Sequence, residues 1–369
     1  MRYLSCFSGI GGLEASKPPV LFCESDPDVA SVLKGLHPKI DVWPDVQTLN
    51  PPAVDVVAGG WPCQDLSIAG LQVGLKGLRS NLLIDMLRVA NKGNAHTVVA
   101  ENVPNLLRMR NGQEFAASLE AFNDHGFKSI SWRILNTRQF GLPQNRSRLL
   151  LIASKEVEIS MTLFRDLPVH SASSTNFETS IEAAGFYWTA GTHSINYNRG
   201  YVPTIKIGSS LGIASPPAVH YGNVVRTLSP AEALALQGFD INEALFPSVS
   251  SAYKAAGNAV ARPIGRWVMD GLTDTGTTAT PNWLPAQDGL FPLEFGINDY
   301  PRAGIAINGN VTPIEVSQTA GAINLIEFLD TTAQERLSAR ASKGLLERLK
   351  RSGQPCPSDL KELLEELAA

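Results

Sequence analysis

A cysteine among turn-forming residues is the first group in this sequence that could do chemistry. Cys63 follows an apolar run, VDVVA, and then Gly59-Gly60-Trp61-Pro62, which is typical of a strand that ends in a tight loop. A partly exposed thiol in such a loop can become a thiolate nucleophile, whereas a structural cysteine in a turn is the alternative. The loop pattern alone leaves both interpretations open.

A carboxylate follows a second apolar run. Glu101-Asn102-Val103 comes directly after TVVA, so the Glu101 side chain is expected at the end of a strand. A carboxyl group there can act as a general acid or base if burial raises its pKa. A solvated glutamate in a turn is the alternative.

A glycine-rich turn near the N-terminus points to a nucleotide-like ligand. Phe7-Ser8-Gly9-Ile10-Gly11-Gly12 follows the first apolar run, and its glycines allow close approach of the backbone to a ligand. The turn does not match the G-x-G-x-x-G pattern of dinucleotide sites. Glu24, after the next apolar run, can accept hydrogen bonds from both hydroxyls of a ribose. Together they predict a ribose-bearing cofactor.

Basic residues concentrate in one further stretch. Gln144-Asn145-Arg146-Ser147-Arg148 follows Lys128, Arg133 and Arg138, and no acidic residue occurs between Gly126 and Ser154. Arginine suits phosphate oxygens and base edges, so we interpret the stretch as a local basic patch. A solvated basic strand is the alternative.

These residues need a scaffold that brings loops together. The first part of the chain alternates short β-type runs with helical patterns, which favours a mostly parallel sheet with crossover helices. Loops that follow parallel strands meet at the carboxyl edge of the sheet, where open α/β folds bind ligands. The predicted strands are Tyr3–Phe7, Val20–Cys23, Val54–Ala58, Thr97–Ala100, Ile130–Leu135 and Leu149–Ala153, and the predicted helices are Asp28–Leu36, Asn81–Asn91 and Gln113–Asn123.

The pattern changes along the rest of the chain. Ser, Thr, Asn, Gly and Pro dominate from about Lys155 to Asn223, which predicts a smaller, irregular β-rich domain. Helical signals return at Ser229–Gly238 and Tyr253–Met269. Ala333–Arg351 and Asp359–Leu367 are expected to form a paired helical hairpin. We predict a catalytic domain over 1–154, completed by 252–272, a target-recognition domain over 155–251, and a C-terminal extension over 273–369.

Composition limits the class of protein. The 369 residues are 44% hydrophobic and 18% charged, with a formal net charge of −4, so a nucleic-acid partner requires a local basic face. No apolar run reaches the length of a membrane-spanning helix, and the N-terminus lacks a signal-peptide pattern. Four scattered cysteines favour neither disulfides nor a metal site. We expect a soluble, cytoplasmic protein without a bound metal.

Read together, the motifs resemble those of the DNA (cytosine-5) methyltransferase family. The resemblance runs from Leu4 to about Met269 and follows the family's motif order. The matching stretches are FSGIGG, GGWPCQDLS, ENV, QNRSR, RTLSPAEALALQGF and AAGNAVARPIG. Six such matches in order are highly specific.

The resemblance implies both a fold and a reaction. The fold is a Rossmann-like domain that depends on S-adenosylmethionine, with a smaller target-recognition domain. Cys63 is expected to attack C6 of a cytosine that has been flipped out of double-stranded DNA, which makes C5 nucleophilic towards the methyl donor. Glu101 would contact N3 and the exocyclic amine. Arg148 would hold O2, with Arg146 supporting the same pocket.

The resemblance also assigns binding residues. Those expected to bind S-adenosylmethionine are Phe7, Gly9, Ile10, Gly11, Gly12, Glu24, Asp45, Pro62, Asn258 and Val260. Within this set Glu24 is the ribose ligand, and Asp45 accepts a hydrogen bond from the adenine amino group. Those expected to bind DNA are Gln64, Ser67, Arg79, Thr204 and Ile205. The resemblance further suggests a monomer on DNA, in a bacterial cell or a phage-infected host, with a cognate restriction endonuclease as a possible partner.

Three alternatives remain at this point. A tRNA-directed cytosine-5 methyltransferase would carry the same catalytic motifs. A catalytically inactive DNA-binding protein of the same fold is disfavoured by the intact Cys63, Glu101, Arg146 and Arg148. A nicotinamide-dependent oxidoreductase would explain only the glycine turn and Glu24.

Overall fold

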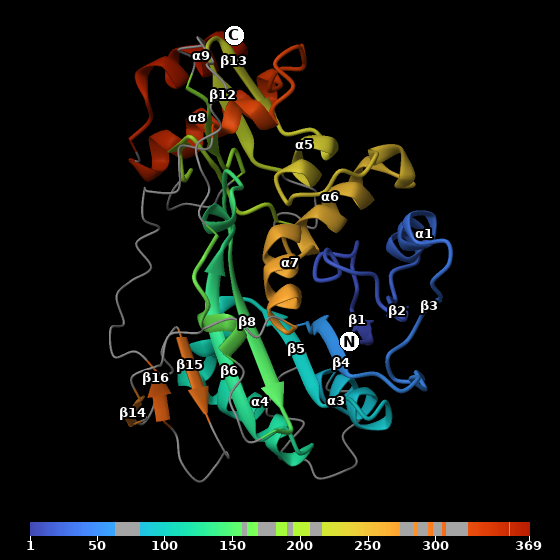
Figure 1. Ribbon diagram of the computed structural model, residues 1–369. Coiled ribbons are helices and arrows are strands. Elements are labelled where there is room, and N and C mark those ends of the chain that lie inside the picture. The colour runs from blue at the N-terminus through green and yellow to red at the C-terminus, as the bar shows by residue number, and fades with distance from the viewer. Residues whose placement is uncertain are drawn as a thin grey trace. The chain divides into compact units, whose positions relative to one another are not determined.

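The structure is a computed structural model (Figure 1) that describes residues 1–62, 82–156, 161–168, 182–189, 195–206, 216–273, 283–285, 294–297, 305–307, 324–353 and 355–369. The chain divides into two compact units. Unit 1 comprises 1–136, 147–167 and 260–315, and unit 2 comprises 137–146, 168–259 and 316–369. The predicted site residues Cys63, Gln64, Ser67 and Arg79 lie outside the described residues.

Unit 1 is built on an eight-stranded sheet with the order β15-β6-β8-β5-β4-β1-β2-β3. The strands from β3 to β5 in this order pair in parallel, whereas β5–β8, β8–β6 and β6–β15 pair antiparallel. The bounds are β1 (Tyr3–Cys6), β2 (Leu21–Cys23), β3 (Val42–Trp43), β4 (Val56–Gly60), β5 (Thr97–Asn102), β6 (Ser129–Asn136), β8 (Ser147–Ser154) and β15 (Glu294–Ile297), and a separate pair is formed by β14 (Trp283–Pro285) and β16 (Ile305–Ile307).

Helices cover this sheet because their apolar residues recur at helical spacing. Leu83, Met86 and Leu87 of α3 join Phe115 and Leu119 of α4 in one buried cluster with strand residues. In Figure 1, α7 lies in front of the sheet and α4 behind it. The bounds are α1 (Pro27–Leu36), α3 (Leu82–Lys92), α4 (Gln113–Asp124) and α7 (Arg262–Gly271).

The predicted mostly parallel α/β fold is confirmed. All six predicted strands and all three predicted helices of the first part are present, with ends that differ by a few residues. β1, β2, β4 and β5 are neighbours that run in the same direction, so the loops that follow them meet at one edge. None of the helices in the described ranges combines the length and apolar character that a bilayer span requires.

One predicted helical stretch, Tyr253–Met269, is divided in the structure. α6 (Val249–Asn258) belongs to unit 2 and α7 to unit 1, with an extended backbone at Ala259 and Ala261. Pro263 explains the break, because proline lacks the N–H that a continuing helix needs but fits the first turn of a new one.

Unit 2 contains a four-stranded antiparallel sheet with the order β10-β9-β12-β13, and β11 pairs in parallel with β7. The strand bounds are β7 (Gln144–Asn145), β9 (Ala184–Phe186), β10 (Asn198–Arg199), β11 (Val202–Pro203), β12 (Ala218–Tyr221) and β13 (Val224–Thr227). The other α-helices in the described residues are α5 (Pro230–Ala235), α8 (Ala339–Ser352) and α9 (Ser358–Ala368). Short 3-10 helices are η2 (Pro104–Leu107), η3 (Met109–Gly112), η4 (Thr137–Phe140), η5 (Met161–Phe164), η6 (Glu243–Leu245) and η7 (Leu325–Phe328).

The C-terminal helices form the predicted hairpin and pack within unit 2. α8 and α9 contact each other, and their leucines join Phe186 of β9 and Val225 of β13 in one apolar cluster. The helical leucines of this cluster are Leu345, Leu349, Leu360, Leu363 and Leu364. The last part of the chain therefore contributes to the hydrophobic core of unit 2.

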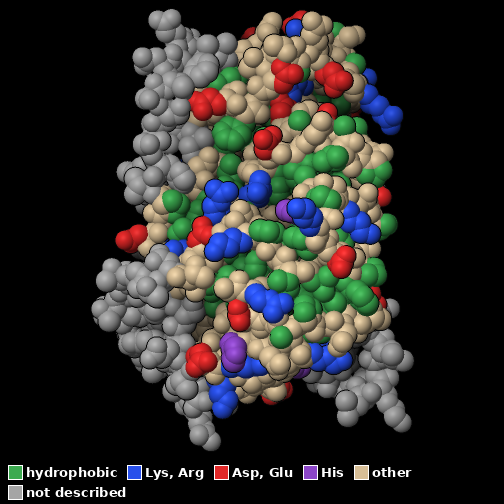
Figure 2. All heavy atoms as spheres, turned by 45° about the vertical axis from the view of Figure 1, so that its right-hand side comes forward, with side chains coloured by type: hydrophobic (Ala, Val, Ile, Leu, Met, Phe, Trp, Pro, Cys, Tyr) green, Lys and Arg blue, Asp and Glu red, His purple; other side chains and the backbone are tan. Residues whose placement is uncertain are grey.

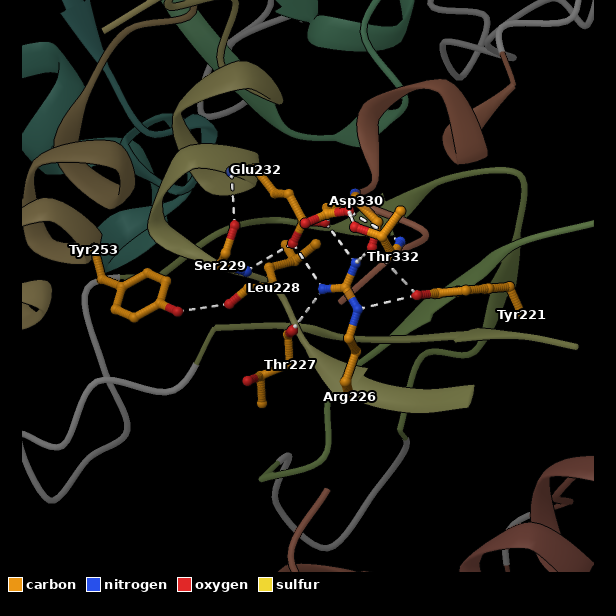
Figure 3. Close-up of polar contacts among 9 residues, drawn as sticks. All are labelled: Tyr221, Arg226, Thr227, Leu228, Ser229, Glu232, Tyr253, Asp330 and Thr332. Atoms are coloured by element: carbon orange, nitrogen blue, oxygen red, sulfur yellow. Dashed lines mark hydrogen bonds and ion pairs between the residues drawn. The ribbon is translucent and has the colours of Figure 1, made fainter. Parts of the chain in front are cut away.

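A buried ion pair ties the start of this C-terminal segment to unit 2 (Figure 3). Arg226 Nη2 lies 2.6 Å from Glu232 Oε1, and the two side chains are 4% and 6% exposed. The backbone of Asp330 contacts both partners, since its N–H donates to Glu232 and its carbonyl accepts from Arg226. Glu232 also completes a capping box with Ser229 at the start of α5.

Removing one partner of this buried pair should destabilise the protein. We expect Arg226→Met to lower the free energy of unfolding by about 3–5 kcal/mol, because the Glu232 carboxylate would stay buried without its cation. The matched control is Arg199→Met, which breaks an exposed pair with Glu182 at 2.8 Å and should change stability little. Urea denaturation measures both. Equal losses in the two variants would contradict this account.

Candidate active site

A carboxylate and a guanidinium meet at the carboxyl end of β5. Arg148 Nε of β8 lies 2.8 Å from Glu101 Oε1, and the two side chains are only 13% and 11% exposed. Glu101 pairs with Gly60 of β4, and a Cβ atom on Gly60 would lie 2.7 Å from Glu101 Oε2. Glycine at position 60 therefore leaves the space that this carboxylate occupies.

Asn102 joins this edge to the loop that leads to Cys63. Its Nδ2 donates to the Trp61 carbonyl at 3.0 Å, and its Oδ1 accepts from the N–H of Val103 at 2.8 Å. Trp61 is buried and Pro62 is exposed. The sequence interpretation used only Glu101 from the ENV motif and missed this role of Asn102. The sequence signal that could have revealed this role is an amide residue directly after a carboxylate at the end of a predicted strand.

Arg146 makes different contacts, and it belongs to unit 2. Its guanidinium donates to the carbonyls of Ile205, Gly257 and Ala259 at 3.1, 2.9 and 2.7 Å, and the residue is 1% exposed. The structure thus brings Glu101 and Arg148 together in unit 1, whereas Arg146 connects two backbone segments of unit 2, Ile205 and Gly257–Ala259.

The Thr204-Ile205 element is held by the same part of the chain. Gln144 Oε1 accepts from the N–H of Ile205 at 3.1 Å, and Thr204 Oγ1 donates to the Asn145 carbonyl at 2.7 Å. Ile205 is 1% exposed, so its side chain is not available to DNA in this structure. The DNA contact expected at Ile205 stays a prediction.

The basic stretch is not the exposed patch that its composition predicts. Arg133 donates to the carbonyls of Leu163 and Arg165, and Arg138 lies over the ring of Tyr201. Arg146 and Arg148 are engaged as described above. The cause is that Arg146 is buried and the other three are only partly exposed, and an arginine shielded from water binds carbonyls, rings or carboxylates.

The glycine-rich turn after β1 is fixed by Glu24. The Gly9 N–H donates to Glu24 Oε2 at 2.8 Å, and the Asp26 N–H donates to Glu24 Oε1 at 2.8 Å. Phe7, Gly9 and Gly11 have φ values of 53°, 54° and 85°. A left-handed backbone at an aromatic residue is unusual, and such strain is found mainly at functional sites.

The final sequence block packs directly on this turn. A Cβ atom on Gly12 would lie 2.1 Å from the Val260 carbonyl, and one on Gly265 of α7 would lie 2.1 Å from the Gly12 carbonyl. Ile10 is buried beneath the turn. The expected return of the final block to the first domain is thus present for Val260 and α7, whereas Asn258 is exposed at the end of α6 in unit 2.

A second carboxylate lies after β3, in the turn that contains Asp45. Asp45 Oδ1 accepts from the N–H of Gln47 at 2.9 Å, and Asp45 is half-buried. Glu24 follows β2 and Asp45 follows β3. Because these two strands pair in parallel, both carboxylates lie at the same edge of the sheet. A carboxylate can accept about four hydrogen bonds, and the contacts from the described residues use only part of that capacity at Glu24 and Asp45.

Glu14 is a buried carboxyl group beneath the glycine-rich turn. Its Oε1 accepts from the Ser5 hydroxyl, whose oxygen lies 2.8 Å from Ser8 Oγ, and Glu14 is 7% exposed. Its Oε2 has no hydrogen-bond partner among the described residues. Burial raises the pKa of Glu14 from 4.5 to about 7, and the charge of Glu24 acts in the same direction.

This shift should make stability depend on pH. The folded state binds a proton more tightly than the unfolded state, so the stabilising contribution is complete below pH 4.5 and is lost as pH rises through about 7. We expect Glu14→Gln to reduce the difference in the free energy of unfolding between low and high pH by up to about 3 kcal/mol. Urea denaturation at pH 5 and pH 8 gives the difference. Parallel stability curves for the two proteins would contradict the assignment.

The chain is similar to known proteins over most of its length. Residues 1–185 match the family model of the C-5 cytosine-specific DNA methylase. The Type II methyltransferase M2.BsuMI of Bacillus subtilis (strain 168) is 31% identical over 388 residues, which cover 95% of this chain and 94% of the relative. That coverage extends into residues 273–369. M.Bsp6I, a Type II methyltransferase of Bacillus sp. (strain RFL6), is 24% identical over 74% of this chain and 98% of its own.

Solved structures support the fold. The Dnmt2 methyltransferase of S. pombe superimposes with a TM-score of 0.53 and 15% identity, covering 74% of this chain and 98% of its own. At this identity the likeness bears on the fold alone. The family match and the 31% identical relative carry the assignment of activity, which is the S-adenosylmethionine-dependent methylation of cytosine C5 in DNA. The chain belongs to the C-5 cytosine-specific DNA methylase family.

Proposed function

We propose that Cys63 is the covalent nucleophile of this DNA methyltransferase, with Glu101 and Arg148 as its partners in the cytosine pocket. The observation that carries the proposal is the nearly buried Glu101–Arg148 pair beside Gly60, three residues before Cys63 in sequence. A charged pair shielded from water at a ligand-binding edge is suited to fixing a polar base edge.

The residues divide the reaction into steps. The Cys63 thiolate adds to C6 of a flipped cytosine, and Glu101 contacts N3 and the exocyclic amine as electron density moves through the ring. Arg148 holds O2 and keeps the Glu101 carboxylate oriented. After C5 has gained its methyl group, a base takes up the C5 proton and the C5–H electron pair forms the C5–C6 double bond. The Cys63–C6 bond breaks at the same time, which releases the methylated base and restores the Cys63 thiolate.

The cofactor site fits the described residues. Glu24 would bind the ribose hydroxyls and Asp45 the adenine amino group, since both carboxylates have free acceptor capacity. The open space at Gly9 admits a ligand beside the turn. S-adenosylmethionine supplies an electrophilic methyl group when bound. The remaining residues of this proposed site are Phe7, Ile10, Gly11, Gly12, Pro62, Asn258 and Val260.

DNA contacts are proposed for both units. Gln64, Ser67 and Arg79 would bind near the flipped base and its phosphates, and Thr204 would contact DNA from the recognition unit. Arg146 would act by positioning backbone segments, given its three carbonyl partners. Figure 2 shows several Lys and Arg side chains at the surface of the face drawn, with acidic side chains among them. Local positive charge of this kind suits phosphate binding by a chain of net charge −4.

The biological setting is also a proposal. The named relatives are Type II methyltransferases, which supports a role beside a restriction endonuclease. We propose that the protein acts as a monomer on DNA in the cytoplasm of a bacterial cell or a phage-infected host. Residues 1–154 with 252–272 would serve catalysis and 155–251 target recognition, whereas 273–369 includes the hairpin that supports unit 2.

Covalent trapping tests the proposed chemistry. Duplex DNA containing 5-fluorocytosine cannot lose a C5 proton after methyl transfer, so an enzyme that uses this route should remain attached to it. We expect a denaturation-resistant adduct that forms only with cofactor and maps to Cys63. A methylating enzyme that forms no adduct, or an adduct at another residue, would overturn the proposal.

A further inference from the structure

Arg88 of α3 reaches the turn that contains Asp45. Its Nη2 donates to the carbonyls of Val46 and Gln47 at 2.5 and 3.0 Å, and its Nη1 donates to the carbonyl of Leu49 at 3.3 Å. Three backbone acceptors within four residues therefore converge on one guanidinium. Asp85, one turn earlier on α3, lies 3.6 Å from Arg88 Nε and balances its charge.

The turn itself fixes the Asp45 carboxylate. Oδ1 accepts from the Gln47 N–H at 2.9 Å, and the Asp45 carbonyl accepts from the Thr48 N–H and Oγ1, both at 3.2 Å. Trp43 Nε1 donates to Thr48 Oγ1 at 3.2 Å. The direction of the carboxylate thus depends on the backbone of residues 46–49, whose carbonyls Arg88 holds.

We infer that Arg88 is a positioning residue that sets how strictly the cofactor site selects an adenine ring. The inference rests on the proposed role of Asp45 as acceptor of the adenine amino group. A planar guanidinium can satisfy several carbonyls in fixed directions, which a lysine ammonium cannot reproduce. Loss of Arg88 removes the donor for these carbonyls. The turn is then free to move, and the Asp45 carboxylate no longer points towards the adenine amino group.

Val46 and Leu49 are buried in the core of unit 1, so Arg88 could serve stability alone. The two roles differ in what they change. A stabilising residue alters the unfolding temperature and leaves selectivity between ligands intact. A positioning residue alters the ratio between a ligand with a 6-amino group and one with a 6-oxo group, because only the first donates to Asp45.

Calorimetric titration of the full-length protein with S-adenosylhomocysteine and S-inosylhomocysteine measures that ratio. The wild type should prefer the adenosyl ligand strongly. Arg88→Met should reduce the preference about 10-fold or more, chiefly by weakening the adenosyl ligand, and Arg88→Lys should retain part of it. In methylation assays, Arg88→Met should raise KM for S-adenosylmethionine while kcat stays within a few-fold. Thermal unfolding is recorded for every variant.

Two further variants separate the possible outcomes. Arg133→Lys, whose guanidinium also binds backbone carbonyls, should keep the wild-type preference. Asp45→Asn should lose it, because an amide can donate to a 6-oxo group. If Asp45→Asn keeps the preference, the proposed role of Asp45 fails and the inference fails with it. If Asp45→Asn loses the preference but Arg88→Met keeps it, only the positioning role of Arg88 is overturned.

Discussion

Replacement of Cys63 by serine is expected to lower kcat for methyl transfer by roughly 10⁴-fold or more, the scale of loss that follows removal of a covalent nucleophile. A serine hydroxyl is far less acidic than a thiol, so almost no anion is present at neutral pH to attack C6. Cofactor binding should survive, because no proposed cofactor contact is made by the thiol. Initial rates with tritiated S-adenosylmethionine and duplex DNA provide the measurement.

The matched control for this variant is Cys356→Ser. Cys356 is half-buried beside the C-terminal hairpin and has no place in the proposed site. Its replacement should leave kcat close to that of the wild type. A Cys63→Ser protein that methylates at a comparable rate would remove the covalent step from the mechanism.

Glu101→Gln should give the second largest loss, about 10²- to 10⁴-fold in kcat/KM. The amide cannot form a charged pair with the Arg148 guanidinium at 2.8 Å, and it cannot transfer a proton to N3, as a carboxylic acid can, when negative charge develops there. Arg148→Lys should be less severe, because the positive charge is retained without the planar donor geometry. Steady-state kinetics with duplex DNA separate the two variants.

Glu114→Gln is a control of similar environment. Glu114 is 2% exposed, and Arg110 Nε lies 3.1 Å from its Oε1, but it lies on α4, which carries no proposed site residue. This variant should lose stability and keep its kinetic constants. If Glu101→Gln and Glu114→Gln behave alike, the Glu101–Arg148 pair is structural.

The sequence was sufficient to predict the sheet edge that positions the site. The runs VDVVA and TVVA lie in strands that end at Gly60 and Asn102, and this pattern of an apolar strand followed by a polar loop is local information. The predicted meeting of Glu101 and Arg148 depended on the family resemblance, since their strands pair across a large sequence separation.

Other features depend on contacts that no local pattern reveals. The composition of QNRSR predicts a basic patch, yet Arg146 is buried and donates to carbonyls from two distant segments. β15 has only four residues, too few for a recognisable alternation, and its pairing with β6 emerges only in the folded chain. The role of Arg88 was missed for the same reason, because its partners are backbone atoms, which the side-chain sequence does not encode.

The most direct test of the central claim follows the methyl group to its product. The purified protein is incubated with tritiated S-adenosylmethionine and either duplex DNA or tRNA, and each nucleic acid is digested and its nucleosides separated. We predict label in 5-methyl-2′-deoxycytidine from duplex DNA. Label confined to tRNA, or to a position other than C5 of cytosine, would contradict the account.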